Sequence, residues 1–351
     1  MTAATRLEDQ PTIPREIPPG SRVLLTGASG LLGRSLARRL AETGYVVTTL
    51  QRGPSQLEGV RDVRGSLTDR AVVAEAMADQ DAVVHMAAKV SVSGRQQDFV
   101  DVNIHGTENV LDAAEAAGVE HVLHVSSPSV AHSGASLVGA GAGDPDPEAA
   151  EGHYARTKAE AELLVQARAA AGMKVLVIRP HLIWGPGDGQ LTRRIVDRAR
   201  SGRLPLIGSG AALVDTLYID NAVDAFAAGL RRLPAIHGKR LVLTNGEPRP
   251  IGELIMGIAA AGGARRPRLR IAPGAAKAAG RAVETLWGLA ERAFGDFEDE
   301  PPMTRFLAEQ LSTAHWFDQR ETREALDWAP AVSIDEGLAR LAEHVRRTGG
   351  V

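Results

Sequence analysis

Residues 22–33 read RVLLTGASGLLG, in which an apolar run passes into three glycines spaced three residues apart, Gly27, Gly30 and Gly33. A segment rich in Ala, Leu and Arg follows directly. Gly27 permits a tight turn, Gly30 lets the backbone approach a pyrophosphate, and Gly33 lets a helix pack closely on a strand. Free N–H groups at the helix start then face the anion. The stretch therefore predicts a dinucleotide-binding turn.

Apolar strands alternate with alanine-rich helical segments through the first half of the chain. Three of these helices end at a glycine, where a left-handed residue is needed before the next strand: Gly44, Gly118 and Gly172. Repeated strand–helix–strand units with right-handed crossovers predict an α/β fold, a Rossmann-type doubly wound parallel sheet. The predicted buried strands are 22–26, 46–51, 61–65, 82–87, 121–126 and 174–180.

The rhythm of strands and helices breaks after Pro180, where Gly- and Pro-rich sequence begins. A helix near 190–201, a helix that starts at 218–221 and a strand at 240–244 follow, so we expect the chain to return to the sheet before leaving it again. The predicted organisation is a flexible tail (1–20), a dinucleotide-binding domain (21–180, with 213–245 returning to it) and a smaller interleaved C-terminal substrate-binding domain (181–212 and 246–345).

Composition excludes several classes of function. The chain has 351 residues, a formal net charge of −3 and no basic stripe interleaved with aromatics, so we expect no nucleic-acid partner. No cysteine is present, which excludes thiolate catalysis, disulfides and cysteine-ligated metals. His121 and His124 stand at odd spacing in a predicted strand and point to opposite faces, so we expect no metal. The first twenty residues contain no apolar run, which predicts no signal peptide, no transmembrane segment and a cytoplasmic protein.

Residues 275–297 show apolar positions at helical spacing, and Pro301-Pro302 ends the pattern. The helix either packs on the core, forms an apolar lid over a hydrophobic substrate, or lies on a membrane surface. Its polar face mixes acidic and basic residues, which favours a lid over a membrane helix. The apolar positions are Ala279, Val283, Leu286, Ala290, Phe294 and Phe297, and the polar ones are Arg281, Glu284, Glu291 and Arg292.

The end of the second strand indicates which cofactor is bound. A carboxylate there would accept the ribose hydroxyls of NAD, but the sequence has Gln51 and Arg52. A guanidinium can bind a 2′-phosphate through two parallel hydrogen bonds, so NADP(H) is favoured. If Arg52 is only a solvated loop charge, NAD(H) remains open. The other predicted cofactor contacts are Ser29, Leu31 and Leu32 in the glycine turn, Ser66 and Leu67 beside adenine, Ala87, Ala88 and Lys89 beside ribose and phosphate, and Pro180 and Ile183.

Tyr154 and Lys158 lie four residues apart in a helical pattern and share one face. The ammonium is expected to lower the pKa of the tyrosine, which can then exchange a proton with a substrate oxygen. Ser127 follows the strand 121–126, at an edge where doubly wound sheets bind ligands. Its hydroxyl can hold a carbonyl while hydride passes from nicotinamide. Alone, the Tyr/Lys pair would suggest a solvated helix face; with the glycine turn it predicts a catalytic set.

The glycine motif, the Ser126-Ser127 pair and Tyr154-x-x-x-Lys158 together resemble the extended short-chain dehydrogenase/reductase superfamily over nearly the whole chain. The resemblance implies Tyr154 as acid/base, Lys158 as its tuner and ribose clamp, and Ser127 as carbonyl anchor. It also implies Asn103 as an interior polar residue near the site, although Asn103 could equally be a structural bond-former. Homodimers through two helices of each subunit are common in that superfamily.

Narrower matches lie within the superfamily. SSPSVA at 126–131 and RPHLIWGPGD at 179–188 resemble the 3β-hydroxysteroid dehydrogenase branch. NGEP at 245–248 and PPMTRFLAEQL at 301–311 resemble the bacterial 2-alkyl-3-oxoalkanoate reductases of olefin biosynthesis. That resemblance implies NADPH-dependent reduction of a 2-alkyl-3-oxo acid to the 3-hydroxy acid, with the helix at 275–297 covering alkyl chains. It also leaves open an association with other enzymes of a lipid pathway.

The chain departs from the superfamily's pattern between Ser127 and Tyr154, where residues 139–147 are rich in Gly, Ala and Pro. This loop, within 133–150, is expected to border the substrate pocket, so the substrate stays open. Arg193 or Arg194 could meet a substrate carboxylate. The alternatives are a 3β-hydroxysteroid or sterol dehydrogenase, a nucleotide-sugar epimerase or dehydratase that retains NAD, and a regulator that binds NADP(H) without turnover.

Overall fold

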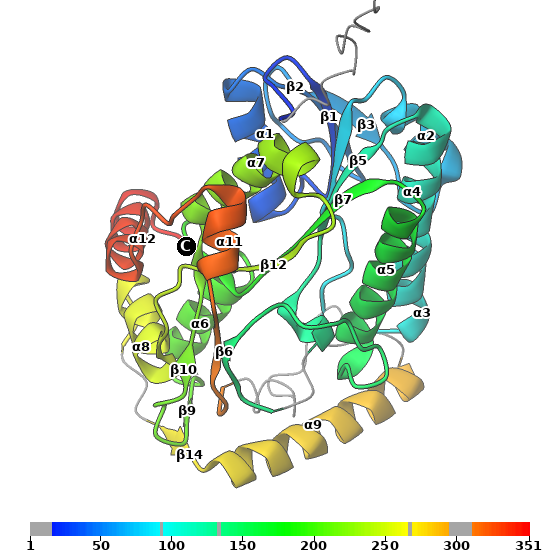
Figure 1. Ribbon diagram of the computed structural model, residues 1–351. Helices are drawn as coiled ribbons and strands as arrows, with labels where there is room; N and C mark the ends of the chain where they lie inside the picture. The colour runs from blue at the N-terminus through cyan, green and yellow to red at the C-terminus, as the bar shows by residue number, and fades with distance from the viewer. Residues whose placement is uncertain (1–15, 92–93, 132–134, 266–268, 295–310) are drawn as a thin grey trace, which may run out of the picture.

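The computed structural model describes residues 16–91, 94–131, 135–265, 269–294 and 311–351. At its centre lies a parallel sheet of seven strands in the order β12-β7-β5-β4-β1-β2-β3 (Figure 1). This order confirms the predicted Rossmann-type doubly wound sheet. The strands are β1 (Arg22–Thr26), β2 (Val46–Gln51), β3 (Arg61–Arg64), β4 (Ala82–His85), β5 (His121–Val125), β7 (Lys174–Pro180) and β12 (Arg240–Leu243).

Helices cover both faces of the sheet, which explains why its strands are apolar on both sides (Figure 1). Along β1, Val23 and Leu25 face the core beneath α1 and α7, while Leu24 faces the core beneath α2, α4 and α5. All three side chains are fully buried. The bounds are α1 (Leu31–Glu42) and α7 (Ile219–Ile236) on one face, and α2 (Arg70–Met77), α4 (Gly106–Ala117) and α5 (Gly152–Ala170) on the other.

The chain runs outward in both directions from the neighbouring strands β1 and β4. From β1 it proceeds to β2 and β3 on one side, and from β4 to β5, β7 and β12 on the other. Ligands of doubly wound sheets bind at such a switch point, beyond the carboxyl ends of the strands. The glycine turn after β1 and the segment after β4 meet there. All six predicted strands are confirmed, with ends that differ by two residues or fewer. The predicted burial is wrong for β3, where only Val63 is buried, because β3 is an edge strand of the sheet.

Smaller elements extend beyond the carboxyl ends of the large sheet. A four-stranded sheet has the order β13-β10-β15-β6, and two two-stranded pairs join β11 to β8 and β14 to β9. The sequence alone did not indicate β6, which lies in the Gly- and Ala-rich loop and pairs with β15, far along the chain. The bounds are β6 (Leu137–Ala140), β8 (Ile183–Trp184), β9 (Leu206–Ile207), β10 (Leu213–Val214), β11 (Leu217–Tyr218), β13 (Arg249–Pro250), β14 (Arg270–Ile271) and β15 (His315–Phe317).

The remaining helices complete the connections between these elements. The predicted helix near 190–201 is confirmed as α6, and the one expected to start at 218–221 is α7. The bounds not yet given are α3 (Gln96–Phe99), the π-helical turn η1 (Val100–His105), the 3-10 turn η2 (Pro128–Ala131), α6 (Leu191–Arg200), α8 (Ile251–Ala261), α9 (Pro273–Phe294), α11 (Arg320–Leu326) and α12 (Ile334–Thr348).

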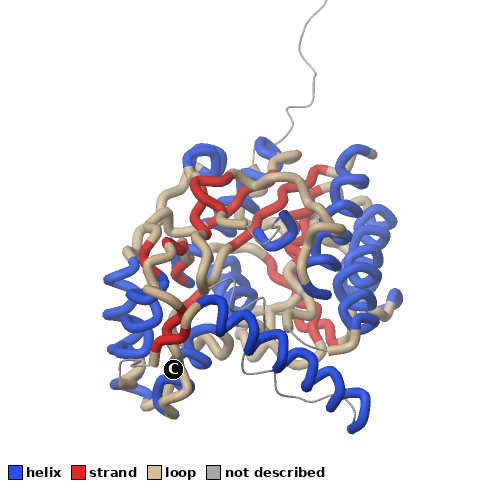
Figure 2. The backbone as a smooth tube through the Cα atoms, turned by 90° about the horizontal axis from the view of Figure 1, so that it is seen from below, coloured by secondary structure: helices blue, strands red, loops and turns tan. Residues whose placement is uncertain are grey.

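The long helix α9 crosses the underside of the molecule, the side to which the segments after β4, β5 and β7 lead (Figures 1 and 2). The predicted inner face is partly wrong, because Ala279 is exposed and Leu286 is 66% exposed. Ala276 and Gly280 are buried instead, since small residues let the helix approach its support. The side chains of Ala290, Phe294 and Phe297, and residues 301–310 of the carboxyl-terminal motif, lie outside the described residues. Within the described ranges, no helix has both the length and the apolar composition needed to cross a bilayer.

The amino-terminal segment reaches the body of the protein at Ile17, which is buried. Its N–H donates to the Arg231 carbonyl at 2.7 Å, and the Tyr45 hydroxyl donates to its carbonyl at 2.9 Å. Residues 1–15 of the expected tail lie outside the described residues. The chain therefore enters β1 from a point fixed on α7.

Candidate active site

The three glycines of the turn after β1 have three different surroundings. Gly27 has a φ of +81°, and a Cβ there would lie 2.8 Å from the backbone of Ala87. A Cβ on Gly33 would lie 2.3 Å from the Gly27 carbonyl oxygen, whereas one on Gly30 would meet nothing closer than 3.8 Å. Helix α1 starts after Gly30 without a side-chain cap and without an acidic residue in its first turn. Its first N–H groups are thus left for an anion, and the turn fits a dinucleotide pyrophosphate.

The edge formed by β2 and β3 carries an unsatisfied amide. Gln51 is buried, and neither its Oε1 nor its Nε2 has a partner in the described chain. Its register partner on β3 is Arg64, and the next residue, Arg52, is exposed. The nearby carboxylate of Asp62 is already engaged by the Thr49 hydroxyl at 2.6 Å. A buried amide without partners costs about 1–3 kcal/mol, so this edge fits a ligand with polar groups, such as a ribose or its phosphate.

Lys89 was expected to place an ammonium near phosphate. The structure brings its Nζ to 2.7 Å from the Asp98 carboxylate and 5.2 Å from the centre of the Phe99 ring. Asp98 also receives a hydrogen bond from Arg95, and its pKa is lowered by these two partners. The ammonium of Lys89 therefore already has a protein counter-charge.

The other predicted cofactor residues occupy the ends of strands and the glycine turn. Ser66 hydrogen-bonds the Thr68 hydroxyl at 2.8 Å, and Leu67 is buried in the core beneath α2 and α4. Ser29 is exposed in the glycine turn, and Leu31 and Leu32, the first two residues of α1, are partly buried. Also partly buried are Ala87 and Ala88 after β4, Pro180 at the end of β7 and Ile183 in β8.

Ser127 and Tyr154 meet at the carboxyl end of β5. The Ser127 hydroxyl hydrogen-bonds the Ser129 hydroxyl at 2.8 Å and accepts the Ser129 N–H at 3.2 Å. Tyr154 lies in the first turn of α5, where burial raises its pKa and a hydrogen bond with Ser127 opposes this rise. The expected net lowering of the Tyr154 pKa is therefore wrong for this structure, because burial outweighs the groups that favour the phenolate. A raised pKa keeps the phenol protonated and suits it to proton donation.

Lys158 is buried one turn further along α5. Its Nζ donates to the Val125 carbonyl at 2.7 Å and lies 3.4 Å from Nε2 of His124. Burial lowers its pKa to about 8, and the charge of Glu162 opposes this shift. The amine therefore titrates close to neutral pH.

Arg179 and Glu162 form an ion pair with no exposed side-chain surface. The guanidinium binds both carboxylate oxygens, with Nε to Oε2 at 3.0 Å and Nη2 to Oε1 at 2.5 Å. Its Nη1 donates to the carbonyl of Ala142 and, at 3.3 Å, to that of Gly143. One buried arginine on β7 thus connects helix α5, which carries Tyr154 and Lys158, with the Gly- and Ala-rich loop.

Asn103, in the π-helical turn η1, uses its whole amide on protein partners. Its Oδ1 accepts the Lys89 N–H at 2.7 Å, and its Nδ2 donates to the Lys89 carbonyl at 3.2 Å and to the Thr157 hydroxyl at 3.0 Å. Of the two roles left open for it, the contacts are those of a structural bond-former.

His85 is a buried residue that the sequence analysis did not single out. The Thr26 oxygen accepts the N–H groups of the two residues after His85, so its own proton is donated to His85 Nδ1 at 2.8 Å. The Nε2–H is then donated to Thr107 at 2.9 Å, and Thr107 donates to the Asn103 carbonyl at 2.6 Å. Burial lowers the pKa of His85 to about 3, so the ring is neutral. Only the register of β4 against β1 creates this chain of hydrogen bonds.

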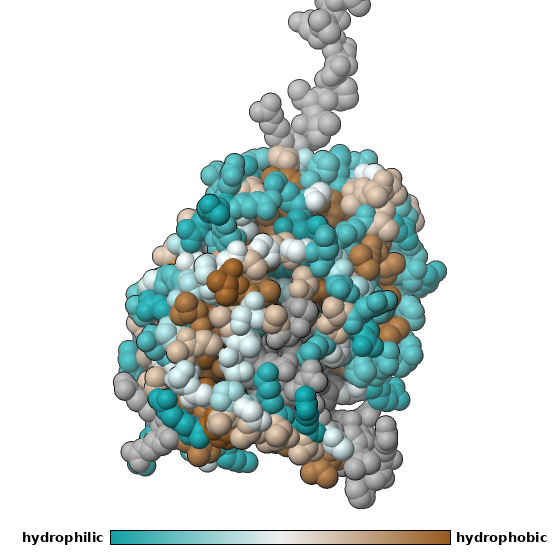
Figure 3. Space-filling view, turned by 60° about the horizontal axis from the view of Figure 1, so that its bottom comes forward, coloured by the Kyte–Doolittle hydropathy of each residue, from teal (hydrophilic) through white to brown (hydrophobic). Residues whose placement is uncertain are grey.

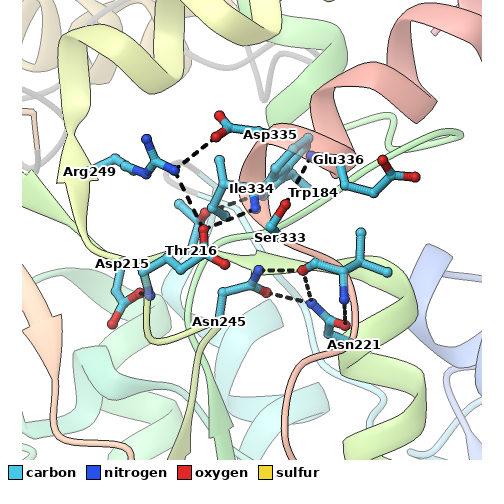
Figure 4. Close-up of polar contacts among 12 residues, drawn as sticks. Trp184, Asp215, Thr216, Asn221, Asn245, Arg249, Ser333, Ile334, Asp335 and Glu336 are labelled. Carbon is cyan, nitrogen blue, oxygen red and sulfur yellow. Dashed lines mark hydrogen bonds and ion pairs between the residues drawn. The ribbon is translucent and has the colours of Figure 1, made fainter.

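The NGEP motif at residues 245–248 binds the segment that leads into α12 through hydrogen bonds. Asn245 and Asn221 each donate to the Val332 carbonyl, at 2.9 and 2.7 Å, and Asn221 also donates to Asn245 Oδ1 at 2.9 Å. Glu247 accepts the Ile334 N–H at 3.2 Å (Figure 4). These bonds hold the start of α12 against α7 and the end of β12.

The two arginines proposed for a substrate carboxylate, Arg193 and Arg194, are exposed on α6. Arg193 Nε lies 3.6 Å from the Asp197 carboxylate. In the part of the chain that is described, no group of three or more metal-binding side chains is present.

Most of the large exposed hydrophobic side chains of the described chain lie on the same side of the sheet as Ser127, Tyr154 and Lys158. Two, Val46 and Leu163, lie elsewhere. Figure 3 shows several hydrophobic patches on this underside. The other six in the described chain all belong to segments beyond the carboxyl ends of the strands: Val90, Val138, Leu182, Leu213, Leu269 and Leu286.

Residues 23–243 match the model of the NAD dependent epimerase/dehydratase family. A 2-alkyl-3-oxoalkanoate reductase from Stenotrophomonas maltophilia is 42% identical over 328 residues, covering 91% of this chain and 98% of that protein. A 3 beta-hydroxysteroid dehydrogenase/Delta 5-->4-isomerase from Mycobacterium tuberculosis is 30% identical over 333 residues, covering 90% and 88%. The solved structure of MoeE5 in complex with UDP-glucose and NAD superimposes with a TM-score of 0.71 at 22% identity, covering 94% and 100%. These findings confirm the extended short-chain dehydrogenase/reductase resemblance and its fold.

Proposed function

Because the chain belongs to the NAD dependent epimerase/dehydratase family, we propose that it is an NADPH-dependent reductase that converts the keto group of a hydrophobic 2-alkyl-3-oxo acid to the 3-hydroxy acid. The protein is an oxidoreductase acting on hydroxyl and keto groups, like its relatives. One observation supports the proposed reduction of a ketone. The hydroxyls of Ser127 and Tyr154 are hydrogen-bonded to each other at the carboxyl end of β5, and the amine of Lys158 is buried one turn further along α5.

Each of these groups has a distinct task in the reduction. The Ser127 hydroxyl accepts the Ser129 N–H and hydrogen-bonds the Ser129 and Tyr154 hydroxyls, and its O–H can turn from these partners to a substrate carbonyl oxygen when substrate binds. Tyr154, whose pKa is raised, holds its proton until negative charge develops on that oxygen and then transfers it. A reduced nicotinamide, when bound, supplies the hydride. The charged Lys158 stabilises the phenolate that remains.

The proposed substrate class rests on the apolar underside and on the relative at 42% identity, whose name describes a 2-alkyl-3-oxo acid. Two alkyl chains need apolar contacts, and exposed hydrophobic residues such as Val138, Leu182 and Leu286 are proposed to supply them. Helix α9 crosses this side and is the proposed cover for the chains (Figure 2).

The proposed preference for NADPH rests on the edge of β2 and β3. Arg52, the residue after Gln51, and Arg64, its register partner on β3, are both exposed there, and the Gln51 amide has no partner in the described chain. Two guanidinium groups beside a buried polar group suit a ribose that carries a 2′-phosphate.

The direct test follows nicotinamide absorbance at 340 nm with NADPH or NADH and a long-chain 2-alkyl-3-oxo acid. We expect turnover with NADPH preferred, and a loss of about 10²–10⁴ in kcat for Tyr154→Phe, because one general acid is removed. The rate should also fall as the pH rises through about 8, where Lys158 loses its charge. Absence of turnover on every hydrophobic ketone would falsify the proposal.

The second candidate is a 3β-hydroxysteroid dehydrogenase, favoured by the relative at 30% identity. The same catalytic set would act on a flat polycyclic alcohol. A 3β-hydroxysteroid with NAD or NADP, assayed beside the oxo acid, separates the two. Turnover on the steroid alone moves the assignment to that class.

A further inference from the structure

A second buried histidine lies behind the catalytic lysine. His124 on β5 is the register partner of His85 on β4, and the two ring centres are 5.4 Å apart. The His124 side chain has no exposed surface. Its Nε2 lies 3.4 Å from Nζ of Lys158, which reaches it from α5. Lys158 therefore packs against a strand of the sheet, and His124 is the side chain of that strand that contacts its amine.

The chemistry of the two groups fixes the direction of this hydrogen bond. An ammonium can only donate, so Nε2 of His124 must be the acceptor. The neutral ring then carries its proton on Nδ1, which has no partner in the described part of the chain. Burial and the charge of Lys158 both lower the pKa of His124 well below its usual value, so the ring remains an acceptor at neutral pH. His85 cannot take this role, since Thr26 and Thr107 use both of its nitrogens.

Two of the three ammonium hydrogens of Lys158 thus have acceptors within the protein. The Val125 carbonyl takes one at 2.7 Å, and His124 takes the second through the longer contact. The third is not used by a described protein group. We propose that His124 is a positioning residue for the reaction, which holds the Lys158 ammonium so that its third N–H points to the cofactor side and its charge acts on Tyr154. This inference rests on the proposed reductase function.

Charged and titratable groups surround the lysine from every neighbouring element. Glu162, on its own helix, favours the ammonium, but its carboxylate is bound by Arg179 of β7. His85 of β4 is neutral, and Tyr154 lies one turn before the lysine on α5. His124 is therefore the neutral side chain that accepts a hydrogen bond from Lys158. Its removal leaves the Glu162–Arg179 ion pair and the bond from Lys158 to the Val125 carbonyl in place.

The experiment compares three variants of the full-length protein. His124→Leu removes the acceptor, and His124→Gln keeps an amide oxygen that can accept. His121→Leu is the matched control, because this histidine lies on the same strand but on the opposite face. The chain has five lysines, so ε-¹³C-lysine NMR resolves the titration of Lys158 in the protein without cofactor, and Lys158→Met assigns the signal.

We expect the Lys158 titration to move to lower pH by about one unit in His124→Leu, because a hydrogen bond to a charged group is lost. The alkaline limb of the kcat profile should move in the same direction, with kcat about tenfold lower and KM little changed. His124→Gln should restore both midpoints, and His121→Leu should leave them unchanged. An unchanged Lys158 midpoint in His124→Leu overturns the proposal, as does a lower kcat without a shift of the alkaline limb.

A measurement on the unmodified protein covers the case in which His124→Leu does not fold. The ¹⁵N shifts of His124 should report the neutral ring with its proton on Nδ1. A proton on Nε2, or an imidazolium, overturns the inference. The NMR results need no substrate, so a failure of the proposed reductase function, seen as absence of turnover, is distinguishable from a failure of the histidine–lysine link.

Discussion

The side-chain amide of Asn103 donates a hydrogen bond to the Thr157 hydroxyl at 3.0 Å, and Thr157 lies on α5 between Tyr154 and Lys158, the two residues of that helix proposed to act in catalysis. The rest of the amide binds the backbone of Lys89. One side chain in a π-helical turn therefore connects the segment after β4 with helix α5. The spacing of Tyr154 and Lys158 is local, but their position relative to β4 depends on this bond.

Asn103→Ala should destabilise the protein by about 1–3 kcal/mol, because the buried Lys89 N–H and the Thr157 hydroxyl lose partners. We expect kcat to fall more than KM rises, since α5 is displaced from the cofactor side. Urea unfolding and steady-state kinetics measure the two effects. Thr157→Val, which keeps the Lys89 contacts, is the control and should retain most of the stability; equal losses in both variants would contradict a role for the Lys89 contacts.

The glycines of the turn should separate folding from cofactor binding. Gly33→Ala puts a Cβ 2.3 Å from the Gly27 carbonyl oxygen and should lower the thermal midpoint or prevent folding. Gly30→Ala meets no atom closer than 3.8 Å, so it should fold normally and weaken NADPH binding. Thermal unfolding and calorimetric titration with NADPH provide the readouts. Similar melting of the two variants would show that the packing argument is incorrect.

Arg52→Ala should raise the KM or Kd for NADPH about 10–100-fold and change that for NADH little, because a charge-assisted contact with the 2′-phosphate is lost. Arg61→Ala is the matched control. This exposed arginine lies at the opposite end of β3 from the cofactor edge and should leave both constants unchanged. An Arg52→Ala enzyme with the original NADPH preference would return Arg52 to the role of a surface charge.

Acidification should unfold the protein partly through His85. Its pKa is about 3 in the folded state and about 6.5 in the unfolded chain, so the unfolded state binds more protons between these values. Stability is therefore lost as the pH falls through this window, by up to about 1.4 kcal/mol per pH unit for this group. Urea midpoints between pH 7 and pH 4 should fall less steeply in His85→Gln. The exposed His237→Gln serves as the control, and a slope unchanged in His85→Gln would exclude His85 as the cause.

Local patterns in the sequence were sufficient for the framework of this protein. The glycine turn, the apolar strands and the Tyr154–Lys158 spacing each depend on residues a few positions apart, where helix and strand periodicities decide which side chains share a face. They predicted the parallel sheet, the family and the oxidoreductase chemistry, all of which are confirmed.

The tertiary structure alone decided the surroundings of those residues. Burial decides the direction of the Tyr154 pKa shift. The contacts of Tyr154 with Ser127, of Lys158 with His124 and of Arg179 with Ala142 join residues that are 27 to 37 positions apart in the sequence. The face that α9 turns inward was predicted in part incorrectly for the same reason. Periodicity defines which residues lie together on an element, but only packing determines what that face meets and how much water is excluded.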